Sequence, residues 1–439
     1  MRTEDKSERV IVFGRYPMLG KVKTRFIPFL GRAGAADLHR ELTEKTLRTV
    51  RIFAIDTGRE TAFCFDGGNR NKTASWVGPG FLLSKQEKGD LGRRMYAAFL
   101  KAFQDGCRRV VLVGTDIPGL AREHLQEAFN VLREKDVVLG PSRDGGYWLV
   151  GMNRPLDIFE GMAWGTHTVL DQTLRVVSKR RLKGHLLHPL TDVDTIEDLK
   201  EWNPRLARKR PYLSVIIPAL NEEGSIGKTI AGAKDPEAEI IVVDGGSSDS
   251  TKVVAKEAGA QVMTTKKGRA FQQNAGAAAA AGKVLLFLHA DTLLPTRYME
   301  HVFEKLLPKR AVAGAFRFKT DCRVPLIGAV EWMTNVRSRI FQLPYGDQAL
   351  FLKKSLFDSL GGFPNVPIAE DLLLVRALRK HGRVRIAQGY AITSGRRWQQ
   401  LGVIRTTLIN WIIMAGCHLG VSPRSLSSLY ILPKKGANR

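Results

Sequence analysis

The stretch Val-Asp-Gly-Gly-Ser-Ser-Asp-Ser-Thr, residues 243–251, decides the fold expected for the second half of this chain. The apolar run Ile240–Val243 leads into it, so we expect Asp244 where a buried strand reaches the surface. The glycines that follow let the backbone approach a ligand closely, and the hydroxyl groups after them suit a helix cap. A carboxylate at this place suits a base edge or a ribose hydroxyl. The alternative is an acidic turn that only caps a helix.

A second unit of the same kind precedes this stretch. The run Ser-Val-Ile-Ile-Pro-Ala-Leu-Asn, residues 214–221, predicts another buried strand, and Glu222 and Glu223 follow it. Two such strands joined by a helix, with polar side chains at their carboxyl ends, are typical of the edge where open α/β sheets bind ligands. The sequence therefore predicts an α/β domain with its binding site at that edge.

Three further pieces carry chemistry in the second half. The apolar run 284–288 leads to His289 and Asp291, and a carboxylate at this place can hold a hard divalent cation that bridges phosphates. The pair Glu370–Asp371 opens a segment with helical apolar spacing, and the run Arg396–Trp398 offers cations and an indole. An acidic pair alone would be a helix cap, so its predicted role depends on the other pieces.

In this order the pieces resemble the family 2 glycosyltransferases, from Leu213 to about Trp398. The resemblance implies a nucleotide-sugar-binding sheet and a divalent metal, Mg²⁺ or Mn²⁺, at Asp291. It makes Asp371, with Glu370 beside it, the catalytic base that deprotonates the acceptor hydroxyl. The residues that it assigns to the nucleotide sugar are Pro218, Asn221, Glu223, Asp244, Arg269, Arg397 and Trp398.

Two positions depart from the family pattern. His289 stands where the family has the first carboxylate of its Asp-x-Asp metal motif, and we expect it beside Asp291 at the metal. Ser394 stands where the family has the glutamine of its Gln-x-x-Arg-Trp element, which leaves the acceptor side of the site open.

The first half carries a different set of motifs. A short strand, Val10–Phe13, leads into a loop that begins at Gly14 and supplies Lys23 and Arg25, a combination that suits a triphosphate although it is not a Walker A motif. Further carboxylates follow predicted strands or stand in a glycine-rich loop. They are Asp116, Asp144, Asp192 and Asp194.

This half resembles the small nucleotidyltransferases of the glycosyltransferase-A superfamily. More closely, the two halves are similar to the paired families called radical-SAM/selenodomain-associated transferase 1, over Arg9–Trp202, and transferase 2, over Leu213–Tyr430. The resemblance implies that Gly14, Lys23, Arg25 and Asp144 bind a nucleotide and that Asp116 and Asp194 hold a metal. The alternative is a degenerate half that only supports its neighbour.

Composition agrees with two folded domains, because 439 residues with a hydrophobic fraction of 44% can build two cores. We predict an α/β protein with two glycosyltransferase-A-like domains in tandem. The first covers residues 1–203, a basic linker covers 204–211, and the second covers 212–439 and ends in an amphipathic helix.

Several classes of protein are disfavoured. The four cysteines have no paired spacing, and the nine histidines form no zinc motif. No Gly-x-Ser-x-Gly elbow supports a hydrolase. The charged start of the chain is unlike a signal peptide, so we predict a cytoplasmic protein.

The formal net charge of +25 favours an anionic partner. Nucleic acid is one candidate, but no specific recognition motif is present. An anionic membrane surface is the candidate that we rank higher, at the inner face of the cell membrane, and a generally basic proteome is the third explanation.

The segment Leu401–Val421 is too short and interrupted to span a bilayer. It carries Trp411, and Arg405 together with Arg424, Lys434 and Lys435 supplies cations around it. We expect either a terminal helix packed on its own domain, which we favour slightly, or a helix that lies in the membrane surface.

The sequence thus predicts a glycosyltransferase that moves a sugar from a nucleotide diphosphate donor to the hydroxyl of a small-molecule or lipid-linked acceptor. Its first half would make or bind an activated nucleotide, using a nucleoside triphosphate, so the enzyme would be bifunctional. Two alternatives stay open: two glycosyltransferase-like halves without nucleotidyl transfer, or a basic binding protein on a degenerate scaffold.

Overall fold

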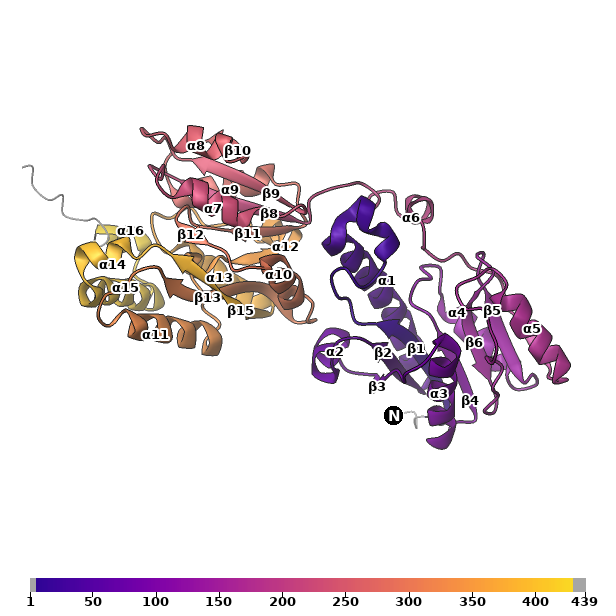
Figure 1. The fold of residues 1–439 in the computed structure, drawn as a ribbon. Coiled ribbons are helices and arrows are strands. Elements are labelled where there is room, and N and C mark those ends of the chain that lie inside the picture. The colour runs from indigo at the N-terminus through magenta and orange to yellow at the C-terminus, as the bar shows by residue number, and fades with distance from the viewer. Residues whose placement is uncertain (1–4, 429–439) are drawn as a thin grey trace, which may run out of the picture. The chain divides into compact units, whose positions relative to one another are not determined.

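The computed structural model describes residues 5–428 and divides into two compact units, with the division between Lys209 and Arg210. Each unit is an α/β domain built on one mixed sheet (Figure 1). None of the helices in residues 5–428 combines the length and hydrophobicity that a bilayer crossing requires. Lys434 and Lys435, which the sequence placed beside a terminal helix, lie outside the described residues.

The first unit has a seven-stranded sheet in the order β3-β2-β1-β4-β6-β5-β7. All neighbours are parallel except β6, which runs antiparallel to β4 and β5. The strands are β1 Asp5–Arg15, β2 Arg59–Asp66, β3 Leu82–Lys85, β4 Arg109–Val113, β5 Val137–Pro141, β6 Tyr147–Met152 and β7 Gly184–Leu186. The helices are the 3-10 turn η1 Thr24–Phe26 and α1 Ile27–Thr57, α2 Arg70–Val77, α3 Leu91–Gln104, α4 Arg122–Val131, α5 Val169–Lys179 and α6 Ile196–Trp202.

The second unit has an eight-stranded sheet in the order β10-β9-β8-β11-β14-β13-β15-β12. Its strands are β8 Leu213–Ala219, β9 Ala238–Asp244, β10 Gln261–Thr264, β11 Val284–Phe287, β12 Thr292–Leu293, β13 Ala311–Thr320, β14 Phe351–Lys353 and β15 Arg383–Thr393. Its helices are α7 Ile226–Ala233, α8 Thr251–Glu257, α9 Arg269–Ala279, α10 Tyr298–Leu306, α11 Ile327–Ile340, the 3-10 turn η2 Gly346–Gln348, α12 Lys354–Ser359, α13 Glu370–His381, α14 Arg396–Leu401, α15 Val403–His418 and α16 Pro423–Ser427.

The two sheets share one strand order. Without the two-residue strand β12, each sheet runs third, second, first, fourth, sixth, fifth, seventh in chain order. The sixth strand is antiparallel to both neighbours in each case, β6 in the first unit and β14 in the second. The order reverses between the first and fourth strands, and such a reversal opens a crevice at their carboxyl ends. Each unit therefore has a binding crevice at a corresponding place.

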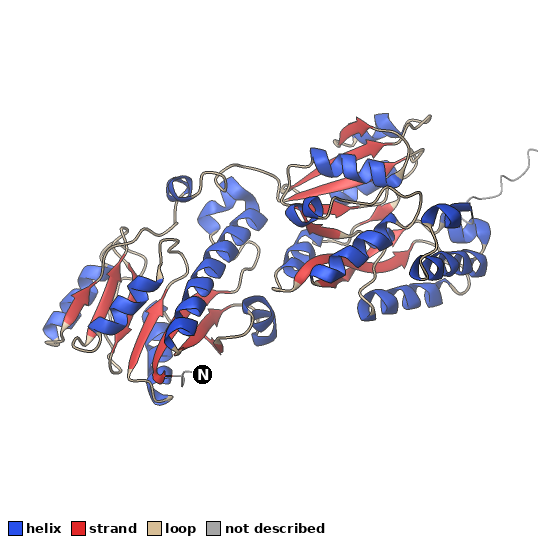
Figure 2. Ribbon diagram, turned by 180° about the vertical axis from the view of Figure 1, so that it is seen from behind, coloured by secondary structure: helices blue, strands red, loops and turns tan. Residues whose placement is uncertain are grey.

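Burial on both faces explains the apolar strands of the second unit. Val215, Ile216 and Ile217 of β8 are fully buried, as expected for parallel strands covered by helices on both sides (Figure 2). Helix α9 approaches β8 closely because Gly276 has no side chain: a methyl group there would lie 2.5 Å from the side chain of Ile216. This close packing places the start of α9, and with it Arg269, at the crevice.

Candidate functional site

A pocket of about 400 Å³ lies at the crevice of the second unit. It brings together predicted site residues from four separate segments: the start of α9, the end of β11, the start of α13 and the start of α14. The sequence-predicted residues that line it are Arg269, His289, Asp291, Glu370, Asp371, Arg397 and Trp398. Helices α11 and α15 supply much of the opposite wall.

Asp371 is held in a defined orientation at the start of α13. The backbone N–H of Gly346 donates to its Oδ2 at 2.6 Å, and the N–H of Leu372 donates to its Oδ1 at 2.7 Å. Gly346 must be glycine, because a methyl group there would lie 2.8 Å from Nε2 of His289 and 3.3 Å from Oδ2 of Asp371. Ala369 precedes the helix in the left-handed conformation, with a φ of 62°. Such strain is common at functional sites.

The groups around Asp371 have perturbed pKa values. Burial, assisted by Arg269, lowers the pKa of His289 to about 3, so its imidazole is neutral at physiological pH. Its Nε2 has no hydrogen-bond partner among the described residues. Burial and the charge of Asp371 raise the pKa of Glu370, which faces Arg269 at 3.7 Å. Burial also raises the pKa of Asp347 to about 6. Perturbed groups gathered in one cleft are typical of an active site.

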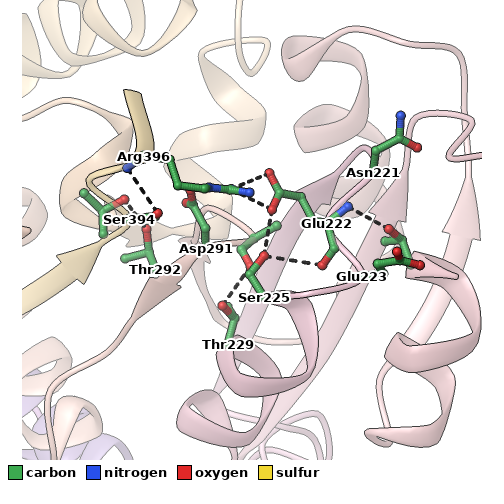
Figure 3. A network of polar contacts seen from close by, with 12 residues as sticks. Asn221, Glu222, Glu223, Ser225, Thr229, Asp291, Thr292, Ser394 and Arg396 are labelled. Atoms are coloured by element: carbon green, nitrogen blue, oxygen red, sulfur yellow. Dashed lines mark hydrogen bonds and ion pairs between the residues drawn. The ribbon is translucent and has the colours of Figure 1, made fainter. Parts of the chain in front are cut away.

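Asp291 is already paired with a cation. Arg396 Nη2 donates to Oδ2 of Asp291 at 3.0 Å and to both carboxylate oxygens of Glu222, at 2.9 and 2.7 Å (Figure 3). Burial raises the pKa of Asp291, although its hydrogen bond from Arg396 acts in the opposite direction. The sequence pattern gave neither Glu222 nor Arg396 a role in the site. The only signal was their position next to assigned residues.

The predicted donor-binding residues Asn221 and Glu223 link two strand-end loops, and Asp244 holds the turn of one of them. Asp244 is fully buried, and its carboxylate accepts hydrogen bonds from the N–H groups of Gly246 at 2.9 Å and Ser247 at 3.0 Å. Asn221 Oδ1 accepts from Ser248 N at 2.9 Å, and Glu223 Oε2 from Ser250 N at 2.8 Å. Pro218 lies in β8 beside these loops. Asp244 therefore forms the acidic turn that we considered as the alternative. A direct contact between Asp244 and a nucleotide stays a prediction.

The first unit has its own pocket of about 600 Å³, which includes the predicted residues Gly14, Lys23, Arg25, Asp116, Asp144 and Asp194. Lys23 is the buried cation of this pocket. Its Nζ lies 2.8 Å from Asp194 and 3.2 Å from Asp116. Burial lowers the pKa of Lys23, but these two carboxylates more than offset the effect and hold its pKa above the usual range.

Three carboxylates in this pocket form a cluster with metal-ligand spacing. One oxygen from each of Asp144, Asp192 and Asp194 lies within 4.8 Å of the other two. Burial and the charges of Asp144 and Asp194 raise the pKa of Asp192 to about 6. Asp116, which the sequence assigned to the metal, lies outside this cluster and pairs with Lys23 instead. The sequence pattern did not assign Asp192 to the metal. A signal was present, because alternate residues of an extended segment, such as Asp192 and Asp194, lie on the same side of the chain.

Residues 214–360 match the family model for glycosyl transferase family 2. This matched segment lies within the second unit and includes the strand end that carries His289 and Asp291. In the first unit, residues 49–166 match a model described as an uncharacterized protein conserved in bacteria (DUF2064). The predicted fold class, two glycosyltransferase-A-like α/β domains in tandem, is confirmed: this family match and the shared strand order of the two sheets agree with it.

The curated proteins that this chain resembles include two whose names state that they transfer or attach sugars. A 4,4'-diaponeurosporenoate glycosyltransferase of Staphylococcus haemolyticus is 30% identical over 145 residues, which cover 29% of this chain and 38% of the relative. A glucosyl-3-phosphoglycerate synthase of Mycolicibacterium paratuberculosis is 34% identical over 101 residues, 19% of this chain and 29% of the relative. The chain thus spans well under half the length of both relatives.

Among solved structures, the chain is similar to a "putative nucleotide-diphospho-sugar transferase" from Desulfovibrio desulfuricans G20. The two are 35% identical, and the match covers 45% of this chain and 87% of the other, with a TM-score of 0.42.

Proposed function

We propose that the second predicted domain, residues 212–439, transfers a sugar from a nucleotide diphosphate donor to an acceptor hydroxyl. The observation that carries this proposal is the meeting of Asp371, His289 and Asp291 in one pocket of the unit that contains the family 2 glycosyltransferase match. Arg269 and Arg397 line the same pocket, and their charges suit the diphosphate of the donor.

Asp371 would act as the general base. As the acceptor oxygen attacks the anomeric carbon, its proton passes to the Asp371 carboxylate, and the electron pair of the breaking C–O bond leaves with the diphosphate. The hydrogen bond from Gly346 N to Oδ2 fixes the carboxylate before the acceptor arrives. The neutral imidazole of His289 lines the same pocket.

A divalent cation, Mg²⁺ or Mn²⁺, fits Asp291, with the imidazole of His289 as a second ligand type. Once bound, it would offset the charge on the departing diphosphate. The described residues of this unit contain no cluster of three ligands, so donor phosphates would complete the coordination. Arg396 holds Oδ2 of Asp291 at 3.0 Å and would have to release it. Arg396 and the cation therefore compete for one carboxylate.

Donor binding in the presence of Mn²⁺ tests this site. Asp291→Asn is expected to weaken Mn²⁺-dependent donor binding by about tenfold or more, because a metal ligand is lost. Arg396→Gln is expected to strengthen it severalfold, because the competing cation is removed. The measurement is isothermal titration of the full chain with a panel of uridine and guanosine diphosphate sugars, with and without Mn²⁺. If Asp291→Asn leaves metal-dependent binding intact, the metal assignment is wrong. If no donor binds to the native chain, the proposed function fails.

For the first predicted domain, residues 1–203, we propose a nucleotidyltransferase-like site that makes or binds an activated nucleotide from a nucleoside triphosphate. Lys23 and Arg25 would hold phosphates, and the backbone of Gly14 lines the same pocket. A divalent cation fits the carboxylates of Asp144, Asp192 and Asp194, whose mutual repulsion it would relieve. We propose further that the two halves correspond to the paired radical-SAM/selenodomain-associated transferases 1 and 2.

The metal ligands of the first unit can be separated by two matched variants. Asp192→Asn is expected to weaken Mn²⁺ binding by about tenfold, because it removes one of three clustered carboxylates. Asp116→Asn is expected to change it by less than about threefold, because Asp116 pairs with Lys23 outside the cluster. Electron paramagnetic resonance titration of free Mn²⁺ measures both affinities. The reverse order of effects would favour the assignment of Asp116 made from sequence.

A second candidate function follows from the strand order that the two sheets share. Both halves would then be glycosyltransferase-like, without nucleotidyl transfer. Pyrophosphate release from a nucleoside triphosphate and a sugar phosphate distinguishes the two, because only the nucleotidyltransferase reaction produces it. A chain that binds no nucleotide or nucleotide sugar in either unit would instead support the non-enzymatic alternative, a basic binding protein.

A further inference from the structure

Helix α15 is apolar on the side that faces solvent as well as on the side that packs. Its inner side contacts the core through Ile413 and Cys417, which are buried. On its outer side, Ile404, Leu408 and Ile412 follow one another at helical spacing and are 64%, 55% and 51% exposed. A helix on the surface of a globular domain normally carries polar residues there.

Helix α11 adds exposed apolar side chains of its own. Trp332 and Ile340 are exposed on this helix, and Phe341 follows directly after it. We refer to these side chains together with those of α15 as the apolar stripes: Trp332, Ile340, Phe341, Ile404, Leu408 and Ile412. Contiguous apolar side chains on a protein surface mark an interaction site more often than scattered ones do.

The two helices that carry the apolar stripes also line the pocket. Val330 and Thr334 of α11 and Asn410 and Met414 of α15 all face it. Trp411 of α15 lines the pocket and is also 53% exposed to solvent, so it lies at the mouth of the pocket. An acceptor could therefore reach the pocket along an apolar surface.

The charges toward the end of the chain are all of one sign. After Asp371 the sequence contains no aspartate or glutamate, so every charged side chain from Leu372 to the end is basic. Arg405 on α15 and Arg424 on α16 are exposed, and so is Arg339 on α11. On α11 the acidic residue is Glu331, which is half-buried and accepts hydrogen bonds from Thr320. Exposed cations beside exposed apolar side chains suit an anionic interface that is apolar beneath its surface.

We propose that the apolar stripes dock on an anionic lipid surface, and that the acceptor is an amphipathic lipid whose hydroxyl enters the pocket past Trp411. This proposal rests on the sugar transfer proposed above and names its acceptor class. A nucleic acid would engage the cations but leaves the apolar side chains without a role. A bilayer engages both, since aromatic and aliphatic side chains enter the headgroup boundary while arginines contact the headgroups.

The test is sedimentation of the full chain with vesicles of phosphatidylglycerol and phosphatidylcholine in equal parts. The native chain is expected to partition onto these vesicles, and at least tenfold more weakly onto phosphatidylcholine alone. Leu408→Glu should weaken partitioning at least tenfold, and Trp332→Glu should do so independently on α11. Val253→Glu is the matched control, because Val253 is 57% exposed on α8, away from the stripes, and should change partitioning by less than twofold.

Three results would overturn the proposal. The native chain could stay in the supernatant, or both stripe variants could partition like the Val253→Glu control, which would leave charge alone as the cause of binding. Light scattering could also show a native dimer that Leu408→Glu dissociates, which would make the stripes a contact between two copies. Nucleotide-sugar binding by each variant verifies its fold. Transfer to a water-soluble acceptor separates the two proposals: it would continue if only the lipid proposal is wrong, and it would be absent if the proposed sugar transfer is wrong.

Discussion

Replacing Asp371 by asparagine is expected to lower the turnover of sugar transfer by about a hundredfold or more, the usual effect of losing a general base. Donor affinity should stay unchanged. The amide oxygen of the asparagine can still accept the hydrogen bond that Gly346 donates at 2.6 Å, whereas the hydrogen bond that Leu372 donates to Oδ1 is lost together with the proton acceptor. This variant therefore separates chemistry from binding.

The measurement is single-turnover transfer from the donor that titration identifies, compared with Asp358→Asn as a control. Asp358 is an exposed carboxylate on α12 that pairs with Lys354 at the surface, so its replacement should leave turnover unchanged. If Asp371→Asn turns over at the native rate, Asp371 is not the general base and only caps the start of α13.

Replacing Asp244 by alanine is expected to destabilise the second unit by ~2–3 kcal/mol. The Asp244 carboxylate is fully buried and accepts hydrogen bonds from the N–H groups of Gly246 and Ser247, which would lose this partner. Urea denaturation of the full chain, followed through the transition of the second unit, measures this free energy. Asp244→Asn keeps one acceptor oxygen and should cost less.

Ser248→Ala is the control for this loop, because the Ser248 hydroxyl contacts Asn221 only at 3.4 Å in an exposed position. Equal stability of Asp244→Ala and the control would show that the buried hydrogen bonds do not hold the turn. The expected loss of stability also affects the binding experiments. A fall in donor affinity in Asp244→Ala would not prove that Asp244 contacts the nucleotide, whereas Arg269→Gln changes an exposed cation that lines the pocket.

Much of the fold could be predicted because its signals are local. The apolar runs around Val10, Val110, Ser214, Ile240 and Val284 all form strands, and the acidic pair Glu370–Asp371 begins a helix. Strand ends are encoded within a few residues, since an apolar run must stop where the chain leaves the sheet. The carboxyl end of a parallel strand also faces the crevice, so the positions of His289 and Asp291 followed from the same pattern.

The segment Leu401–Val421 was only partly predictable. The sequence left open whether it packs on its domain or lies in a membrane surface, and the structure places α15 on the domain through Ile413 and Cys417. Its outer side keeps the apolar character that motivated the second interpretation. Hydropathy alone could not distinguish the two sides, because the helix is apolar all round.

By itself, the sequence determined two α/β domains, the strand ends that carry carboxylates and the resemblance of the second half to family 2 glycosyltransferases. Only the tertiary structure decided which charges meet. Arg396 reaches Glu222, 174 residues away, and Lys23 reaches Asp194, 171 residues away. Such pairs depend on strand order and helix packing, which bring distant segments to one edge of the sheet. Residue type and local spacing carry no record of such distant neighbours, and so the three aspartates predicted to hold metals, Asp116, Asp194 and Asp291, proved to face basic side chains.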